Sequence, residues 1–251
     1  MLRGDTVPSR PKVFPDLVEG AGLARPMTFF EFQTMFDVVY YGEKNKRDYE
    51  TDLILAMRLL KETTRLLEPT RKDRREEMAV DLTYVYAWSN AAGSRLKIDI
   101  ETAMKHKYPG ICSYCLREET CMCGTEHPKK IPAEEKERTI RRVRIEQGGR
   151  PPLVLRRERE FHKRLYLWQH ETEEPLKLVA HIAEEADEFC TEVFFKDHQK
   201  AADELADVVA WTLTTANRLK LEPFDEYVWR QFPYECNRCQ KRECICTEII
   251  F

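Results

Sequence analysis

Glycine and long apolar runs are scarce in this sequence. Only 9 of the 251 residues are glycine, and no stretch approaches the roughly 18 consecutive apolar residues of a membrane-spanning helix. Alternation of apolar and polar residues at the period of a β-strand is nearly absent. These absences argue against a membrane protein and a β-fold. They favour a helix-rich chain, long enough for one large domain or two of about 100 to 150 residues.

An excess of charge of one sign is also missing. Charged residues make up 34% of the chain, yet the formal net charge is only −3. The sequence as a whole therefore has no electrostatic attraction for nucleic acid or an anionic membrane, and we expect neither as a partner. Residues 1–23 lack an apolar segment of signal-peptide length, so we expect a cytoplasmic protein with a disordered or loosely packed N-terminal segment.

The sequence repeats itself at an offset of 123 residues. The stretch 86–99, YAWSNAAGSRLKID, aligns with 209–222, VAWTLTTANRLKLE, and five positions are identical. Further on, YPGICSYC at 108–115 aligns with FPYECNRC at 232–239. A period this long is typical of a duplicated domain rather than a solenoid. We expect two copies, an N-terminal half at residues 24–123 and a C-terminal half at residues 151–251, joined by a charged linker at 124–150.

Apolar residues inside the halves recur at helical spacing. In the C-terminal half these residues are Leu176, Val179, Ala180 and Ala183, then Leu205, Val208, Val209 and Leu213. Thr28 and Glu31 have the spacing of a capping box at the start of a helix. The pattern predicts an all-α protein in which the two halves pair as helical bundles within one chain, as an intramolecular pseudo-dimer.

Acidic residues lie at helical spacing beside this apolar stripe. Glu185 and Glu188 are three positions apart, and so are Glu204 and Asp207, so each pair shares one face of its helix. Converging carboxylates repel one another unless a divalent cation lies between them, and oxygen ligands suit Mg²⁺ or Mn²⁺. A single pair of this kind usually belongs to a solvated helix face. Two pairs on consecutive helices favour a metal site and a phosphate ester substrate.

The pattern EExxE, a spacer and then ExxD, followed by VVAWTLTTANRLKLE, resembles the MazG-like all-α nucleotide pyrophosphohydrolases. The resemblance covers roughly residues 160–230. It implies a four-helix bundle formed by two helical hairpins or by dimerised chains. It also implies that the acids bind Mg²⁺, which grips a nucleoside triphosphate, and that the products are a nucleoside monophosphate and pyrophosphate.

The resemblance assigns roles to individual residues. It implies that the ligands of Mg²⁺ or Mn²⁺ are Glu185, Glu188, Glu204 and Asp207. Glu184 or Glu185 would take a proton from the attacking water. Among the substrate-binding residues, Asn217 and Lys220 would lie near the ribose or phosphates, and Arg230 would replace a basic residue near the end of the next helix. Apart from the resemblance, Trp168 and His170 precede these helices and are candidates to pack against the base. Phe194 is a further aromatic candidate, although aromatic residues in helices more often belong to the core.

The N-terminal half lacks most of these acids. At the offset of 123, its counterparts are Lys61, Glu62, Arg65, Asp81 and Tyr84. Arg65 places a fixed positive charge where a cation would bind, so we expect this half to be a scaffold without the metal. Lys105 and Lys107 would still reach phosphates held by the other half if the two halves pair.

Eight of the nine cysteines form two similar quartets. They are Cys112, Cys115, Cys121 and Cys123 in the N-terminal half, and Cys236, Cys239, Cys244 and Cys246 in the C-terminal half. The four thiolates of each half fit one structural Zn²⁺ ion in a small zinc knuckle, which gives two ions in the chain. An iron–sulfur cluster or redox-active disulfides are the alternatives. Cys190 stands alone, as a small buried apolar residue.

The sequence leaves several functional readings open. The favoured one is a magnesium-dependent nucleoside triphosphate pyrophosphohydrolase, whose helical bundle offers a surface for forming a homo-oligomer. An alternative is a non-catalytic zinc-knuckle protein that binds nucleotides or protein partners. A third is a hydrolase of a phosphoribosyl-nucleotide or a dinucleotide. Knuckles that bind single-stranded nucleic acid need stacking aromatics, and Tyr114 is the only aromatic within either quartet.

Overall fold

The computed structural model describes residues 24–41, 51–112, 114–121, 123, 131–147 and 151–246, except for the side chains of residues 168–170. Within these ranges the regular secondary structure is helical, apart from one isolated bridge between Thr28 and Val154. The all-α prediction is therefore confirmed. The prediction of a loose segment at residues 1–23 lies outside the described residues.

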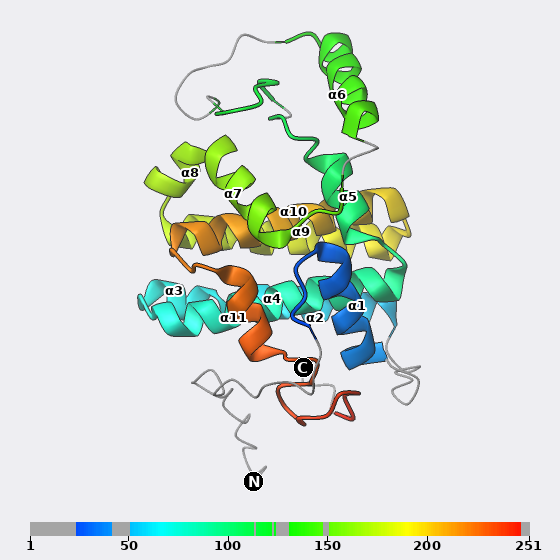
Figure 1. Cartoon of the computed structure of the whole chain (residues 1–251), viewed down its shortest axis with the longest axis vertical. Helices are drawn as coiled ribbons and strands as arrows, with labels where there is room; N and C mark the ends of the chain where they lie inside the picture. The colour runs from blue at the N-terminus through cyan, green and yellow to red at the C-terminus, as the bar shows by residue number, and fades with distance from the viewer. Residues whose placement is uncertain are drawn as a thin grey trace.

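The helices follow one another along the chain in the order shown in Figure 1. They are α1 (Phe29–Tyr41), α2 (Asp52–Arg65), α3 (Leu67–Arg71), α4 (Arg75–Leu96), α5 (Ile100–Lys107), α6 (Ala133–Gln147), α7 (Leu155–Leu165), α8 (Leu167–Thr172), α9 (Pro175–Phe195), α10 (His198–Arg218) and α11 (Phe224–Gln231). Helix α6 lies in the segment expected to be a linker and stands at one end of the molecule (Figure 1).

Four long helices form the core of the molecule. Helices α9 and α10 pack against each other and against α2 and α4, giving a bundle of two layers (Figure 1). The side chains between the layers are fully buried, among them Leu59 of α2, Tyr86 of α4, Phe189 of α9 and Leu213 of α10. Burial of large apolar residues from all four helices drives the two hairpins together.

The shorter helices cross from one half to the other. Helix α5 follows α4 in the chain but packs on α10. In the opposite sense, α11 follows α10 and packs on α4 (Figure 1). Each half therefore covers the long hairpin of the other half with a short helix. This exchange brings residues of α5 to the acidic face of α10.

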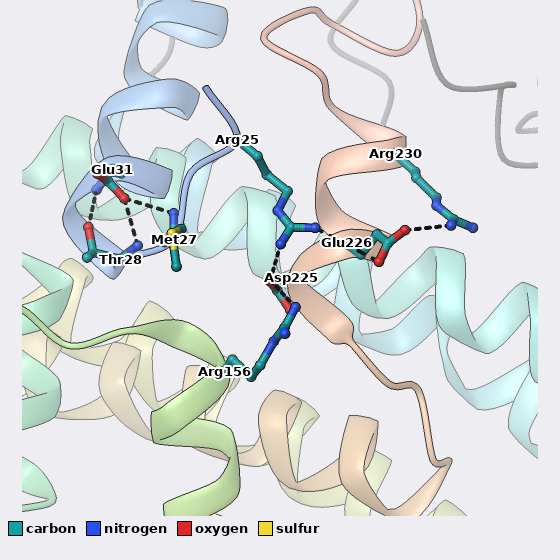
Figure 2. Close-up of polar contacts among 8 residues, drawn as sticks. All are labelled: Arg25, Met27, Thr28, Glu31, Arg156, Asp225, Glu226 and Arg230. Atoms are coloured by element: carbon teal, nitrogen blue, oxygen red, sulfur yellow. Dashed lines mark hydrogen bonds and ion pairs between the residues drawn. The ribbon is translucent and has the colours of Figure 1, made fainter. Parts of the chain in front are cut away.

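The starts of α1 and α7 are joined directly. The amide N–H of Phe29 donates to the carbonyl of Leu153 at 3.1 Å, and that of Leu155 donates to the carbonyl of Met27 at 2.9 Å. The predicted capping box is confirmed, because Glu31 accepts from the amide of Thr28 at 2.9 Å and its own amide donates to Thr28 Oγ1 at 3.1 Å (Figure 2). This cap fixes where α1 begins.

Helix α11 is tied to the same region by a buried acid. Asp225, in the first turn of α11, lies 3.2 Å from a guanidinium nitrogen of Arg156 on α7 and 3.5 Å from one of Arg25 (Figure 2). Asp225 is only 5% exposed, so the two arginines compensate a charge that water hardly reaches. The contact fixes α11 against α7 from the same half.

The helix positions match the offset seen in the sequence. Helices α2 and α9 begin at residues 52 and 175, and α4 and α10 begin at residues 75 and 198, so both pairs differ by 123. Helices α5 and α11 begin at residues 100 and 224, which differ by 124. Duplication as the origin of the two halves remains a prediction.

The apolar stripe of α9 is rotated from the predicted one. Leu176 is 46% exposed and Ala180 is exposed as well. Val179 is buried as predicted, but its buried companions are Leu178, Ile182, Ala186 and Phe189. The larger side chains at these positions set the rotation of the helix, because they bury more apolar area. In α10 the four predicted residues are all buried.

Across the part of the chain that is described, no helix combines the length and the apolar character needed to cross a bilayer.

Candidate active site

Three glutamates of α9 and α10 come together on the surface of the bundle. Glu185 and Glu188 come from α9 and Glu204 from α10, and each offers a carboxylate oxygen within 4.8 Å of the others. Glu185 is partly buried, Glu188 is exposed and Glu204 is partly buried. The group therefore opens to solvent on the side of Glu188, and a cation or ligand has a way in.

Crowding of the acids changes their protonation. Burial, followed by the charges of Asp207, Glu204 and Glu188, raises the pKa of Glu185 to about 8. A hydrogen bond from Trp211 Nε1 to Glu185 Oε1, at 3.2 Å, partly opposes this rise. Burial also raises the pKa of Glu204, and the positive charge of the nearby Lys107 opposes this rise. Without a cation, the group holds a proton at neutral pH.

Asp207 lies beside this group and is held by α5 and the residue after it. It is 8% exposed. Lys107 Nζ is 2.8 Å from Asp207 Oδ2, and the hydroxyl of Tyr108 donates to Oδ1. Burial raises the pKa of Asp207, while Lys107 and Tyr108 lower it. A carboxylate has about four lone-pair directions, so Asp207 keeps acceptor capacity for a cation after both contacts.

Two residues at this site, Tyr108 and Trp211, were not predicted from the sequence. The hydroxyl of Tyr108 reaches Asp207, and the indole of Trp211 reaches Glu185 and stacks on His181 with ring centroids 4.4 Å apart. Trp211 repeats as Trp88 in the N-terminal half, which was a usable signal. Tyr108 had none, because its role depends on α5 crossing to the other half.

Glu184 is not among the grouped glutamates. Its side chain is 62% exposed, and its Oε2 lies 3.2 Å from His181 Nδ1 on the same helix. The structure therefore does not bring Glu184 into the group.

The remaining predicted substrate residues lie elsewhere. Asn217 is buried and donates to the carbonyl of Arg159 at 3.0 Å, and Lys220 is exposed beyond the end of α10. At about 1.5 Å per residue they are roughly 15 and 20 Å along the helix axis from Asp207. Arg230 of α11 pairs with Glu226 at 2.6 Å (Figure 2). None of the three contacts the acidic group.

Among the aromatic candidates, the structure describes the side chain of Phe194 alone. The side chains of Trp168 and His170 lie outside the described residues. Phe194 is 64% exposed and lines a surface pocket between the end of α9 and the start of α2. Of the two lysines expected to cross between halves, Lys107 is at the site. Lys105 instead pairs with Glu101 on its own helix at 2.7 Å.

The matching position in the N-terminal half holds an internal ion pair. Arg65 lies 3.3 Å from Glu62 on the same helix, so a guanidinium occupies the neighbourhood of the remaining glutamate. Tyr84, at the position that corresponds to Asp207, accepts a hydrogen bond from Asn237. Polar groups of the chain itself therefore fill this region of the N-terminal half.

Each cysteine quartet forms a compact group in space. All four sulfur atoms of each quartet lie within 4.8 Å of one another, and the nine cysteines, all of them described, form no disulfide. Sulfur–sulfur distances of 3.3, 3.8 and 3.9 Å in the first group and 4.0 Å in the second are close to the roughly 3.8 Å edge of a tetrahedral site with Zn–S bonds of about 2.3 Å. Each group can therefore hold a single tetrahedral metal ion. Cys190 is buried, as predicted.

Comparison with known proteins identifies the segment that carries the acids. Residues 173–225 match the family described as MazG nucleotide pyrophosphohydrolase domain, which is 53 of the 251 residues. The match spans α9 and α10 and contains all five predicted acids. No curated protein and no solved structure matches the chain. The segment that holds the acids is therefore similar to the MazG nucleotide pyrophosphohydrolase domain.

Proposed function

We propose that this protein hydrolyses nucleoside or deoxynucleoside triphosphates to the monophosphate and pyrophosphate, with Mg²⁺ or Mn²⁺ as cofactor. The observation that carries the proposal is the group formed by Glu185, Glu188 and Glu204, within the segment that matches the MazG family. Carboxylates held this close favour binding of a divalent cation, because the cation offsets their mutual repulsion.

The residues present fit such an ion. The donors are carboxylate oxygens, which hard ions such as Mg²⁺ prefer, and Mg²⁺ commonly completes its coordination with water and phosphate oxygens. Burial and then the neighbouring acids raise the pKa of Glu185 to about 8, so a cation among these carboxylates would replace a bound proton. The ligands would be Glu185, Glu188, Glu204 and Asp207. When bound, the ion supplies charge neutralisation of the phosphates and a lower pKa for a coordinated water.

The other residues prepare this site. Trp211 fixes one oxygen of Glu185 by its indole N–H. Lys107 and Tyr108 fix both oxygens of Asp207, so the carboxylate has one orientation. Glu185 is the better placed of the two proposed proton acceptors, because Glu184 contacts His181 at the exposed edge. In its ionised form Glu185 can take a proton from a water on the open side of the group.

We propose that the N-terminal half is a scaffold. Its Glu62 pairs with Arg65, and its long helices complete the bundle against α9 and α10. We further propose that the two halves arose by duplication and that each cysteine group holds one structural Zn²⁺. Both proposals rest on the sequence repeat and on the compact sulfur groups.

The test is a nucleotide panel with and without Mg²⁺, in which pyrophosphate and nucleoside monophosphates are both measured, because a dinucleotide is cleaved to two monophosphates without release of pyrophosphate. The panel contains the canonical ribonucleoside and deoxynucleoside triphosphates, a dinucleotide and a phosphoribosyl-nucleotide. We expect release from at least one triphosphate only when Mg²⁺ or Mn²⁺ is present. Glu204→Gln and Glu185→Gln should each reduce the rate by about 100-fold or more. Asp187→Asn, which removes one exposed charge from the same helix, is the matched control and should leave it unchanged.

Other outcomes decide between the remaining functions. Hydrolysis of only the dinucleotide or the phosphoribosyl-nucleotide would replace the triphosphate as substrate while keeping the site. Nucleotide binding without hydrolysis would contradict the enzyme and favour a binding protein. Full activity in Glu204→Gln would place the reaction elsewhere in the chain.

A further inference from the structure

The N-terminal cysteine group lies one short loop away from the residues that hold Asp207. Tyr108 and Lys107 end α5, and Cys112 follows four residues after Tyr108. The loop between them is packed into the protein, since Pro109 and Ile111 are buried. The position of the cysteine group therefore constrains where the end of α5 lies against α10.

Contacts between aromatic rings also connect Tyr108 to the N-terminal cysteine group, by way of α7. Tyr108 lies edge-on to His162, with ring centroids 4.9 Å apart, and His162 lies 5.8 Å from the ring of Tyr166. Tyr166 in turn packs against the buried cluster of Cys112, Cys121 and Leu165. His162 is only 1% exposed, so this path runs through packed interior.

The cysteine group is itself fastened to the end of α7. The amide N–H of Cys121 donates to the carbonyl of Leu165 at 2.6 Å. A cysteine ligand from the N-terminal half thus bonds to a helix of the C-terminal half. Tyr108 joins the two helices, since its hydroxyl donates to Asp207 of α10 and its ring contacts His162 of α7.

The C-terminal cysteine group makes the equivalent contacts on the opposite side. The amide N–H of Cys244 donates to the carbonyl of Val39 in α1 at 2.7 Å, and Asn237, inside that quartet, donates to Tyr84. Tyr84 occupies the position that corresponds to Asp207, in the half without the acid group. The two cysteine groups therefore have matching contacts, but only the first faces the acids.

We propose that the N-terminal cysteine group, acting through Tyr108, positions Asp207 for divalent cation binding, whereas the C-terminal group has no such role. Tyr108 is a positioning residue, since it acts through the carboxylate of Asp207. The inference rests on the proposed function for the cation site, of which Asp207 is a proposed ligand. Partners that orient a metal ligand commonly change metal affinity or activity by about 10-fold to 100-fold when removed.

The first experiment measures Mn²⁺ affinity by electron paramagnetic resonance, without any nucleotide. Tyr108→Phe keeps the ring against His162 and removes only the hydroxyl, and we expect it to weaken Mn²⁺ binding by about 10-fold. Tyr84→Phe removes the hydroxyl that accepts from Asn237 of the C-terminal cysteine group, and it should leave the affinity unchanged. An unchanged or tighter affinity in Tyr108→Phe would overturn the proposal, as would equal losses in both variants.

The second experiment compares the two cysteine groups directly. Cys115→Ser and Cys239→Ser occupy corresponding, partly buried positions, and each should lower bound zinc by one equivalent. We expect only Cys115→Ser to weaken Mn²⁺ binding by about 10-fold. Equal affinities in both variants would overturn the role of the first group. If Cys115→Ser fails to fold, the Tyr108→Phe and Tyr84→Phe pair decides the question.

Kinetics separate this inference from the proposed function. With an active enzyme, we expect Tyr108→Phe to raise the Mg²⁺ concentration needed for half-maximal rate, while the melting temperature falls no more than in Tyr84→Phe. A lower melting temperature of Tyr108→Phe with an unchanged Mg²⁺ requirement would show that Tyr108 has only a structural role. If no nucleotide is hydrolysed and the Mn²⁺ pattern still holds, the proposed function fails and the positioning role stands.

Discussion

Lys107 and Asp207 lie a hundred residues apart in the sequence and form an ion pair of 2.8 Å across the interface between the two halves. Their side chains are 33% and 12% exposed, so the aspartate end is poorly hydrated. The pair neutralises the innermost acid of the site and fixes α5 on α10. It therefore contributes both to stability and to the shape of the cation site.

Breaking this ion pair should destabilise the protein. Lys107→Met leaves Asp207 buried with Tyr108 as its remaining partner, and we expect unfolding in urea to show a loss of about 1 to 3 kcal/mol. The double variant Lys107→Met, Asp207→Asn should lose less than the sum of the single changes. Lys177→Met breaks an exposed pair with Glu173 and should cost less than about 1 kcal/mol. Additivity within about 0.5 kcal/mol would show that Lys107 and Asp207 do not couple.

The stability of the metal-free protein should fall as the pH rises. The pKa of Glu185 is about 8 in the folded state against an ordinary value of 4.5, so between these values the unfolded chain releases a proton that the folded protein keeps. The free energy of unfolding therefore decreases with rising pH through this window, by at most about 1.4 kcal/mol per pH unit for one proton, and levels off above about pH 8. Glu204, whose pKa is also raised, adds to the decrease.

Thermal unfolding between pH 5 and pH 9 measures this effect. Glu185→Gln should flatten the pH dependence, because the amide has no proton to exchange in this range. Saturating Mg²⁺ should stabilise the wild-type protein most at pH 8, where the cation replaces the bound proton. Parallel curves for the wild-type protein and Glu185→Gln would refute the assignment of this titration to Glu185.

The ion pair of the N-terminal half should matter for stability alone. Arg65→Gln removes the guanidinium beside Glu62, whose side chain is only 9% exposed, and we expect a loss of about 1 to 2 kcal/mol. Nucleotide hydrolysis should remain within about two-fold of the wild-type rate when measured well below the melting temperature. A large loss of activity at unchanged Mn²⁺ affinity would show that this half takes part in the reaction.

Metal analysis should find about two zinc ions per chain. Cys190→Ser should keep both ions, because Cys190 lies outside the two groups, whereas Cys236→Ser should keep one. Slow removal of zinc by a chelator should lower the melting temperature, since each group fastens the chain after α5 or α11. Iron and sulfide in place of zinc would refute the assignment. Thiols that become detectable only after reduction, in a protein without bound metal, would favour disulfides.

Much of the candidate site was readable in the sequence. The spacing of Glu185 with Glu188 and of Glu204 with Asp207 places each pair on one helix face, because helix geometry is local. The cysteine quartets and the capping box at Thr28 and Glu31 are also local patterns, and the structure brings their members together. The charge of Arg65 already indicated an altered site in the N-terminal half.

The tertiary structure alone decided how these parts combine. The contact of Tyr108 with Asp207 depends on α5 crossing to the opposite hairpin, and the burial of Asn217 against Arg159 depends on α7 packing on α10. Both result from the burial of apolar surface between elements far apart in the chain. Helical periodicity determined which side chains share a face, while the packing of the two halves determined which faces meet.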